Sequence, residues 1–443
     1  MTESLSYFEK EKQWHIFQDT LKKRYPKYYK MRYETIQIEA DEVIQSVPET
    51  TSVVRYFFIE KELYAFVITH GKQYLMSLDF NDLEGIISQV VDQQFDEAML
   101  LGRLHTLYNR LWKPIADLGL TKDVIIIPDG SLYNLSFEML TPTKVVNYED
   151  LVTASLLNDH DITYNFSLLM IQPTSSRSLQ NNFIAFTPEF TKGMKDDYKV
   201  AIVDSLDIDQ TYLTLLSQPF SVDVAQNYNR LFDGDHFKNK AATKQLFIEN
   251  AGEHKIIHIG THAESNNIRP ELSRLIFAKR ITDNQLMEDN SLYTYEIYNC
   301  NLTANLAILT ACETGKPTYQ AGEGMISLAH AFTYAGSESI LTSLWKIDEQ
   351  SSSLIVGYFY DNLEEGMPKH VALKKAKQQY LQTVEGRLLQ PNYWAGLVLM
   401  GDNTPIDISQ DTVGNTFWYS MLAIVVIVAM FFLLRSKKKK DSV

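Results

Sequence analysis

Two short apolar segments of this 443-residue chain each lead to a side chain that can take part in chemistry. Residues 255–259 lead to His262, and residues 306–309 lead to Cys312, about fifty positions later. Such β-branched runs are typical of buried parallel strands, and open α/β folds place their sites at the carboxyl edge of the sheet. A thiol becomes nucleophilic when it loses its proton, and a neighbouring imidazole stabilises the thiolate. The pair therefore predicts a cysteine-protease dyad.

The residues around Cys312 make this interpretation more specific. A histidine about fifty residues before a Q-A-C-x-G cysteine is typical of caspases, and residues 310–315 read Thr-Ala-Cys-Glu-Thr-Gly, which meets that string only in part. The motifs that follow are more informative. The chain closely resembles the CHAT domain, a caspase-like family that often follows tetratricopeptide repeats, in four runs: residues 321–329, 331–336, 342–348 and 393–399.

The resemblance covers roughly residues 51–402 and is strongest after His258. It implies that His262 and Cys312 are the catalytic pair of an endopeptidase that acts on protein or peptide substrates and needs no cofactor. The expected oxyanion donors are the backbone N–H groups of Ala263 and Cys312. Family members commonly have glycine at position 263, and alanine keeps the N–H donor while it loses conformational freedom.

Three acidic residues flank the predicted site. Glu313, Glu323 and Asp348 could orient His262 or line the pocket for the substrate side chain that precedes the scissile bond. Glu323 and Asp348 also precede predicted helices, where carboxylates commonly cap the N-terminus. The sequence leaves both interpretations open, and capping is the simpler one for these two residues.

Other kinds of site fit the sequence less well. His254, His258 and His262 have the four-residue spacing of metal ligands on a helix, but the isoleucines between them predict a strand, in which residues four apart are separated by about 13 Å. Residues 310–317 resemble a phosphate loop but lack its first glycine and its final hydroxyl residue, which argues against a nucleotide-dependent switch. The alternative from another class is a catalytically silent caspase-like scaffold for protein interactions at the membrane.

The second half of the chain alternates apolar runs with helical stretches. Strands are expected at residues 183–187, 256–259, 307–310, 339–344 and 397–400. This alternation predicts an α/β fold, namely an α/β/α sandwich with a mainly parallel sheet, and the resemblance implies that this sandwich is caspase-like. A helix after Cys312 is expected to turn one apolar stripe toward the sheet, namely Met325, Leu328, Ala329 and Phe332.

The first half is interpreted as a non-catalytic, pseudo-caspase support. Residues 51–69 predict a hairpin, residues 82–112 predict one helix that ends at Pro114, and residues 124–127 predict a buried strand. Residues 128–138 resemble a motif of the family's N-terminal half. The expected organisation is a helical join to upstream repeats (1–50), a non-catalytic half (51–175), a catalytic half (181–402), a linker (403–415), a transmembrane helix (416–434) and a basic tail (435–443).

Composition and charge limit the partners. With 45% hydrophobic and 12% aromatic residues, the chain can fill large cores. Its net charge of −14 disfavours nucleic acid as a partner. The preferred partners are a protein or peptide substrate and a regulatory repeat region or sensor protein. The two cysteines, Cys300 and Cys312, are too few for a disulfide framework.

The C-terminal segment suggests a further partner, the lipid bilayer. Residues 416–434 contain nineteen residues without a charge, and residues 435–443 carry five basic side chains and one acidic one. This pattern predicts a single-pass membrane protein with a cytoplasmic tail. The side of the catalytic body stays open, because residues 1–10 lack the apolar core of a secretory signal.

Overall fold

The computed structural model describes residues 10, 12, 14–20, 22–23, 29, 40–92, 96–171, 179, 181–202, 208–266, 268–282, 285–286, 289–310, 318–320, 324–326 and 328–408. The chain divides into a large compact unit, Met1–Ile406, and a small one, Asp407–Val443. All elements presented below belong to the large unit.

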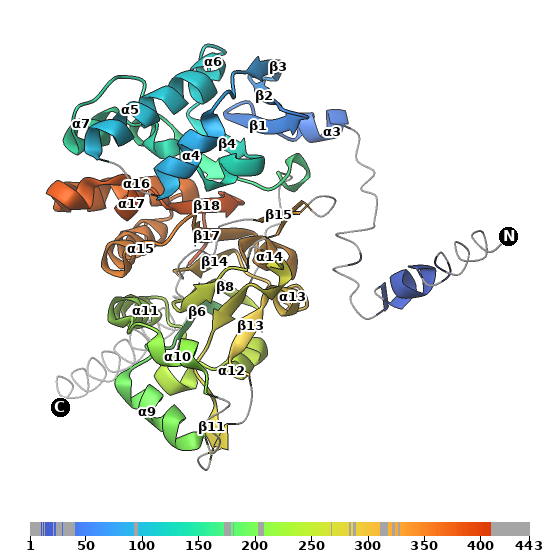
Figure 1. Ribbon diagram of the computed structural model, residues 1–443, viewed down its shortest axis with the longest axis vertical. Helices are drawn as coiled ribbons and strands as arrows, with labels where there is room; N and C mark the ends of the chain where they lie inside the picture. The colour runs from blue at the N-terminus through green and yellow to red at the C-terminus, as the bar shows by residue number, and fades with distance from the viewer. Residues whose placement is uncertain are drawn as a thin grey trace, which may run out of the picture. The chain divides into compact units, whose positions relative to one another are not determined.

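An eleven-stranded sheet organises the large unit (Figure 1). In sheet order its strands are β3 (Lys72–Leu78), β2 (Glu62–Thr69), β1 (Thr51–Ile59), β4 (Asp123–Ile127), β5 (Asp161–Tyr164), β18 (Leu397–Gly401), β17 (Ser339–Ser343), β14 (Leu306–Leu309), β8 (His254–Ile259), β6 (Asn181–Thr187) and β7 (Asp235–Lys238). The pairs β3–β2, β2–β1 and β18–β17 are antiparallel, and the remaining pairs are parallel. The predicted α/β fold with a large, mostly parallel sheet is confirmed.

Three smaller sheets lie outside the large one. They are β13 (Ser291–Tyr293) with β10 (Arg274–Ile276) and β9 (His262–Glu264), β11 (Ile281–Thr282) with β12 (Gln285–Leu286), and β15 (Thr318–Gln320) with β16 (Gly324–Ile326). The chain enters β9 only two residues after β8 ends, which places His262 beside the edge of the large sheet.

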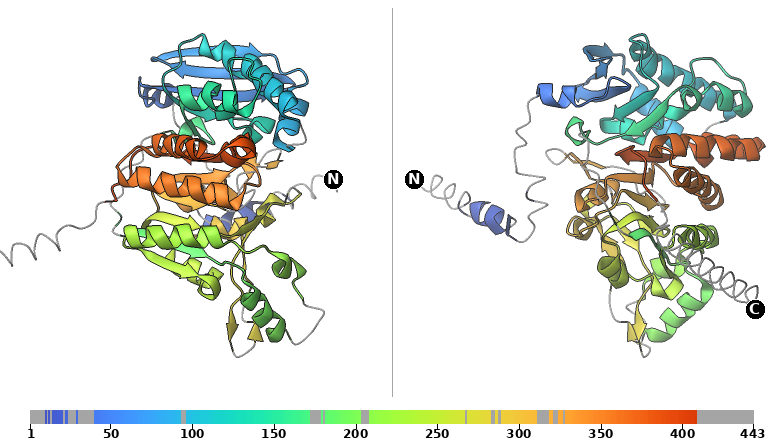
Figure 2. Two further views of the ribbon diagram at one scale, coloured as in Figure 1. Left: turned by 90° about the vertical axis from the view of Figure 1, so that its left-hand side faces the viewer. Right: turned by 180° about the vertical axis from the view of Figure 1, so that it is seen from behind.

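Helices cover both faces of the large sheet. The helices are α3 (Ala40–Gln45), α4 (Leu83–Asp92), α5 (Glu97–Leu107), α6 (Lys113–Ala116), α7 (Tyr148–Ala154), α8 (Leu156–Asp159), α9 (Lys192–Ala201), α10 (Gln210–Thr214), α11 (Pro219–Leu231), α12 (Lys244–Asn250), α13 (Thr294–Ile297), α14 (Leu328–Ala335), α15 (Glu349–Glu364), α16 (Lys369–Thr383) and α17 (Pro391–Trp394). Helices α16, α15 and α11 stack along one face (Figure 2), and α12, α13 and α14 lie on the other side (Figure 1).

The hairpin predicted at residues 51–69 is confirmed, because β1 and β2 pair antiparallel from Val53 opposite Ile68 to Ile59 opposite Glu62. The strand β3 extends it into a three-stranded antiparallel layer. The apolar pattern did not predict β3, because this edge strand is mostly exposed or half-buried and contains polar side chains.

The single helix predicted for residues 82–112 is wrong. The segment forms α4 and α5, and the Asp96 side chain begins α5 by accepting a hydrogen bond from Met99 N at 2.9 Å. A π-helical turn at Tyr108–Trp112 then leads into α6, which contains Pro114. Proline does not end the helix here because the first turn of a helix tolerates a residue without an N–H.

The helix predicted after Cys312 begins later than expected. Leu328, Ala329 and Phe332 are buried on α14, as the stripe predicted, whereas Met325 belongs to the strand β16. Strand pairing between β15 and β16 therefore replaces the first expected turn of this helix.

Basic side chains on α16 join the two parts of the large sheet. At the junction between them, β5 and β18 have one registered residue pair, Met400 opposite Tyr164. Across this junction Lys374 Nζ lies 2.7 Å from an oxygen of Asp161 at the start of β5, and the buried Lys377 Nζ bonds to Glu138. Side-chain ion pairs thus reinforce a place where backbone pairing is short.

The expected location as a single-pass membrane protein is contradicted. Among the residues described by the structure, no helix is long and apolar enough to cross a bilayer. Even α15, with 16 residues, would rise only about 24 Å against a hydrocarbon core of about 30 Å. The segment 416–434, on which the expectation was based, lies outside the described residues.

The buried pair of Lys377 and Glu138 leads to a stability prediction. Replacing one partner leaves the other charge buried without compensation, which typically costs about 3–5 kcal/mol. We expect Lys377→Met to lower the free energy of unfolding by that amount and the double variant Lys377→Met/Glu138→Leu to recover most of it, as measured by urea unfolding. A single variant as stable as the parent would contradict this role.

Candidate active site

The site begins with the pairing of two neighbouring parallel strands. Strands β8 and β14 are in register from Leu306 opposite Ile256 to Leu309 opposite Ile259. Thr310 N extends this pairing by donating to Ile259 O at 3.2 Å. Because parallel strands end at the same edge, the chain leaves β8 toward His262 at the place where it leaves β14 toward Cys312.

His262 is held by a backbone carbonyl. Its Nε2 lies 2.8 Å from the carbonyl oxygen of Leu216, in the loop between α10 and α11. A carbonyl only accepts, so this bond requires the proton on Nε2 and leaves Nδ1 of the neutral ring as an acceptor. The Phe190 ring packs beside the imidazole, with 5.3 Å between ring centroids. The arrangement fixes both the orientation and the tautomer of a possible base.

The surroundings keep this imidazole neutral. Burial lowers the pKa of His262, and the bond to the Leu216 carbonyl opposes this shift. The positive charges of Lys346 and Lys195 lower the pKa further, whereas Glu264 raises it. The net shift is downward from the ordinary value of 6.5, so the ring is available as a proton acceptor at neutral pH.

Near His262, the end of β8 and the starts of α11 and α15 approach one another closely. A Cβ atom at Gly260 would lie 1.9 Å from Ser221 Oγ, so only glycine permits this contact between the end of β8 and the start of α11. Ser221 Oγ also lies 3.5 Å from Thr310 Oγ1. Ser221 N donates to Glu349 Oε1 at 3.1 Å, which ties the starts of α11 and α15 together. Burial raises the pKa of Glu349.

The predicted site residues have different outcomes. Ala263 lies in β9 opposite Leu275 of β10. Asp348 caps α15, because its Oδ1 accepts from Ser351 N and Ser351 Oγ, each at 2.8 Å. The remaining three predicted residues, Cys312, Glu313 and Glu323, lie outside the described residues.

The three histidines of the β8 segment do not share a partner. His254 Nδ1 lies 2.8 Å from Gly252 O, and the fully buried His258 has Nδ1 2.7 Å from the hydroxyl of Tyr360. Burial lowers the pKa of His258 to about 3, so this ring stays neutral inside the sheet packing. His258 is therefore a packing residue inside the protein, whereas His262 lies beside the edge of the large sheet.

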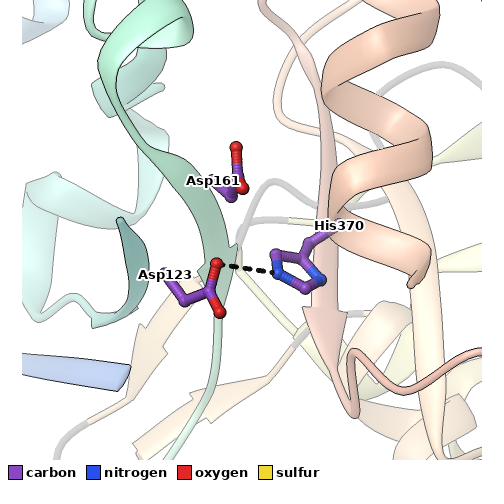
Figure 3. A group of neighbouring side chains, drawn as sticks. All are labelled: Asp123, Asp161 and His370. Atoms are coloured by element: carbon purple, nitrogen blue, oxygen red, sulfur yellow. Dashed lines mark hydrogen bonds and ion pairs between the residues drawn. The ribbon is translucent and has the colours of Figure 1, made fainter. Parts of the chain in front are cut away.

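A separate group of possible metal ligands consists of Asp123, Asp161 and His370 (Figure 3). Their nearest ligand atoms lie within 4.8 Å of one another. Asp161, however, is already bound by Lys374 at 2.7 Å and by Lys122 at 3.0 Å, and these bonds lower its pKa against the effect of burial. His370 Nε2 lies 3.4 Å from Asp123 Oδ1. Because the ammonium groups of Lys374 and Lys122 both bond to Asp161, this group of possible ligands is better suited to an ion-pair network than to the binding of a metal cation.

Sequence reasoning missed the residues that act through the backbone. The Leu216 carbonyl has no sequence signal, because any residue supplies one. Ser221 and Glu349 belong to helix starts far apart in the chain, and only folding brings them together. Gly260, directly after an apolar run, was the one available sign of a close approach.

Comparisons with known proteins identify the family of the chain and proteins of similar fold. The model of the CHAT domain family matches residues 102–402. Similar curated proteins include tetratricopeptide repeat protein 28 of Homo sapiens, 19% identical over 70% of this chain, and its Mus musculus counterpart, 24% identical over 35% of this chain. The chain spans only 13% and 6% of the length of these two relatives.

Among solved structures, the separase of a Saccharomyces cerevisiae separase–securin complex is similar in fold, with a TM-score of 0.51 and 8% identity. The match covers 81% of this chain and 30% of that one. The Arg-specific cysteine proteinase gingipain R is a more distant match, with a TM-score of 0.41, 9% identity and coverage of 74% and 75% of the two chains.

The electrostatics of His262 can be tested by NMR titration of its ring in a Cys312→Ala background. We expect a midpoint below the ordinary 6.5, because burial disfavours the charged ring. Lys346→Glu should raise the midpoint, since it replaces a repelling charge with an attracting one, whereas Lys199→Glu, at an exposed position on α9, serves as the control. An unchanged midpoint in Lys346→Glu would refute the assigned surroundings.

Proposed function

The chain belongs to the CHAT domain family, and on this basis we propose that it is a cysteine endopeptidase with Cys312 as nucleophile and His262 as base. One observation carries the proposal. The imidazole of His262 is held through Nε2 by the Leu216 carbonyl at the sheet edge where β14 ends, three residues before Cys312. A histidine fixed in this tautomer presents Nδ1 for proton transfer.

The proposed reaction uses only groups of the chain and water. His262 Nδ1 takes the proton of the Cys312 thiol, and the thiolate attacks the carbonyl carbon of the scissile peptide bond. Backbone N–H groups of Cys312 and Ala263 stabilise the resulting oxyanion. The imidazolium then donates its proton to the departing amine as the C–N bond breaks, and water hydrolyses the thioester in the second half of the reaction.

The Leu216 carbonyl has a defined part in this mechanism. When His262 gains the proton of the thiol, both ring nitrogens become donors and the ring carries a positive charge. The carbonyl dipole, 2.8 Å from Nε2, stabilises that charge without adding a buried anion. A backbone group can therefore do here what a carboxylate does in serine-protease triads.

We assign the acidic residues different parts. Asp348 already caps α15 through Oδ1, so we assign it to the helix start. Glu313 is proposed to line the pocket that receives the substrate side chain, because it directly follows the nucleophile in the sequence. Glu323 is proposed to share this pocket, because the chain continues from it into the strand β16 and not into the helix for which capping was the simpler interpretation. The substrate itself is proposed to be a protein or peptide.

Regulation by helical repeats is part of the same proposal. The similar curated proteins are named for tetratricopeptide repeats, and the chain matches only a small part of their length. We propose that a repeat region or sensor protein positions the segment after Cys312 and thereby sets activity. By itself the chain is expected to be weakly active, so strong cleavage of generic peptides by the purified chain would contradict this regulation.

Covalent labelling tests the dyad directly. A peptidyl vinyl sulfone should label the purified chain at one cysteine, and Cys312→Ala should abolish the adduct in intact-mass spectra while Cys300→Ala keeps it. His262→Ala should slow labelling by about 100-fold or more, because the thiolate loses its base and positioning partner.

A matched histidine control separates the chemistry from folding. His254 lies at the opposite end of β8 and bonds to the Gly252 carbonyl, so His254→Gln should label at the parental rate. Thermal melting of all variants verifies folding. Equal slowing at both histidines, or labelling of Cys300, would refute the dyad and favour the catalytically silent scaffold.

A further inference from the structure

A cavity that shares no residue with the candidate active site lies near the helices α9 and α10. It has a volume of about 580 Å³ and is lined by residues of α9, of α10 and of the segment that enters β11. These three elements lie near one another in Figure 1. Its polar lining comes from Asp197, Lys240, Lys279 and Arg280, and its apolar lining includes Met194 and Ile281. None of these residues has a part in the proposed peptidase reaction.

The cavity wall is held in place by Lys279. This buried ammonium group lies 2.9 Å from Asp209 Oδ2, donates to Asn290 Oδ1 at 2.9 Å, and stands over the rings of Tyr198 and Tyr212 at 4.7 and 4.9 Å. Its donors are therefore used within the protein. Lys279 contributes a fixed positive charge to the cavity and is not itself a flexible ligand group.

Two further cations at the cavity keep donors for a ligand. Lys240 forms an ion pair with Asp197, which uses one of its three N–H groups. Arg280 donates through Nη1 to the neutral side chain of Gln245, and among the described residues no carboxylate pairs with its guanidinium, a group with five N–H donors. Both side chains are exposed to solvent and can reorient toward a ligand.

We propose that this cavity binds a small phosphorylated molecule of about mononucleotide size. Among the described residues that line the cavity or bond to its lining, Lys240, Lys279 and Arg280 carry three positive charges against the two carboxylates of Asp197 and Asp209, in a chain whose net charge is −14. A phosphoryl group accepts several charge-assisted hydrogen bonds at once, which matches the planar donor fork of Arg280 with Lys240 beside it.

The size and lining indicate more than a free anion. A volume of 580 Å³ falls in the range of about 300–1,000 Å³ that is usual for small-molecule sites. Met194 and Ile281 offer apolar contacts for the organic part of the ligand. This site is independent of the incomplete phosphate loop at residues 310–317, because it uses side-chain cations instead of a glycine-rich backbone.

Calorimetric titration of the full chain tests the site with adenosine monophosphate and inorganic phosphate as probes. Adenosine monophosphate should bind with a dissociation constant below about 1 mM, more tightly than phosphate, and binding should weaken as salt is raised. Arg280→Gln and Lys240→Gln should each weaken it about tenfold, because each removes a charged donor.

Lys238→Gln is the matched control, since this exposed lysine lies two residues from Lys240 and bonds to Gln226 outside the cavity. It should bind adenosine monophosphate as the parent does. Absence of binding at millimolar probe, tighter binding of phosphate alone, or equal weakening by Lys238→Gln would overturn the proposal. The titration is carried out on Cys312→Ala as well, so its outcome does not depend on peptidase activity.

Discussion

The buried basic face of α16 is the interaction on which the continuous sheet depends. Four neighbouring side chains on this helix meet carboxylates from four other places in the chain: Lys369 with Asp402, His370 with Asp123, Lys374 with Asp161, and Lys377 with Glu138. Burial lowers the pKa of Lys369 and Lys377, and their partners oppose that shift. Such pairs add little net stability over apolar packing, but breaking one is costly. Three of these contacts, those with Asp123, Asp161 and Glu138, link α16 to the hairpin-bearing part of the sheet, whereas Lys369 bonds to Asp402 directly after β18.

This constraint reaches the candidate active site through helix packing. Helix α15 packs between α16 and α11, and its first residue, Glu349, bonds to the backbone of Ser221 beside Gly260. A displacement of α16 would move α15 and with it the contact between Glu349 and Ser221 near His262. The strands of the first half of the chain lie at the other end of the same sheet, so this packing is continuous from one part of the sheet to the other.

The extent to which the sequence predicts this structure depends on the range of the interactions involved. Strands made of β-branched residues, such as residues 255–259, were predictable because burial on both faces leaves a continuous apolar run. The edge strand β3 was missed because edge positions tolerate Lys72 and Gln73. His262 was found from its place after a strand, whereas its Leu216 partner was not, because a carbonyl belongs to every residue. The burial of Lys374 and Lys377 on α16 was not predictable, because their carboxylate partners Asp161 and Glu138 lie more than 200 residues earlier in the chain.

Aromatic packing connects the candidate active site with the cavity proposed to bind a phosphorylated ligand. The ring of Phe190 lies 5.3 Å from that of His262 and 5.7 Å from that of Tyr212, which in turn faces the ammonium group of Lys279. Phe190 and Tyr212 form one buried cluster with Tyr198 and Ile276, the residue opposite His262 in β10. Close-packed interiors transmit displacement because they contain little free volume. A ligand that moves Tyr212 would therefore also move Phe190, against which the His262 imidazole packs.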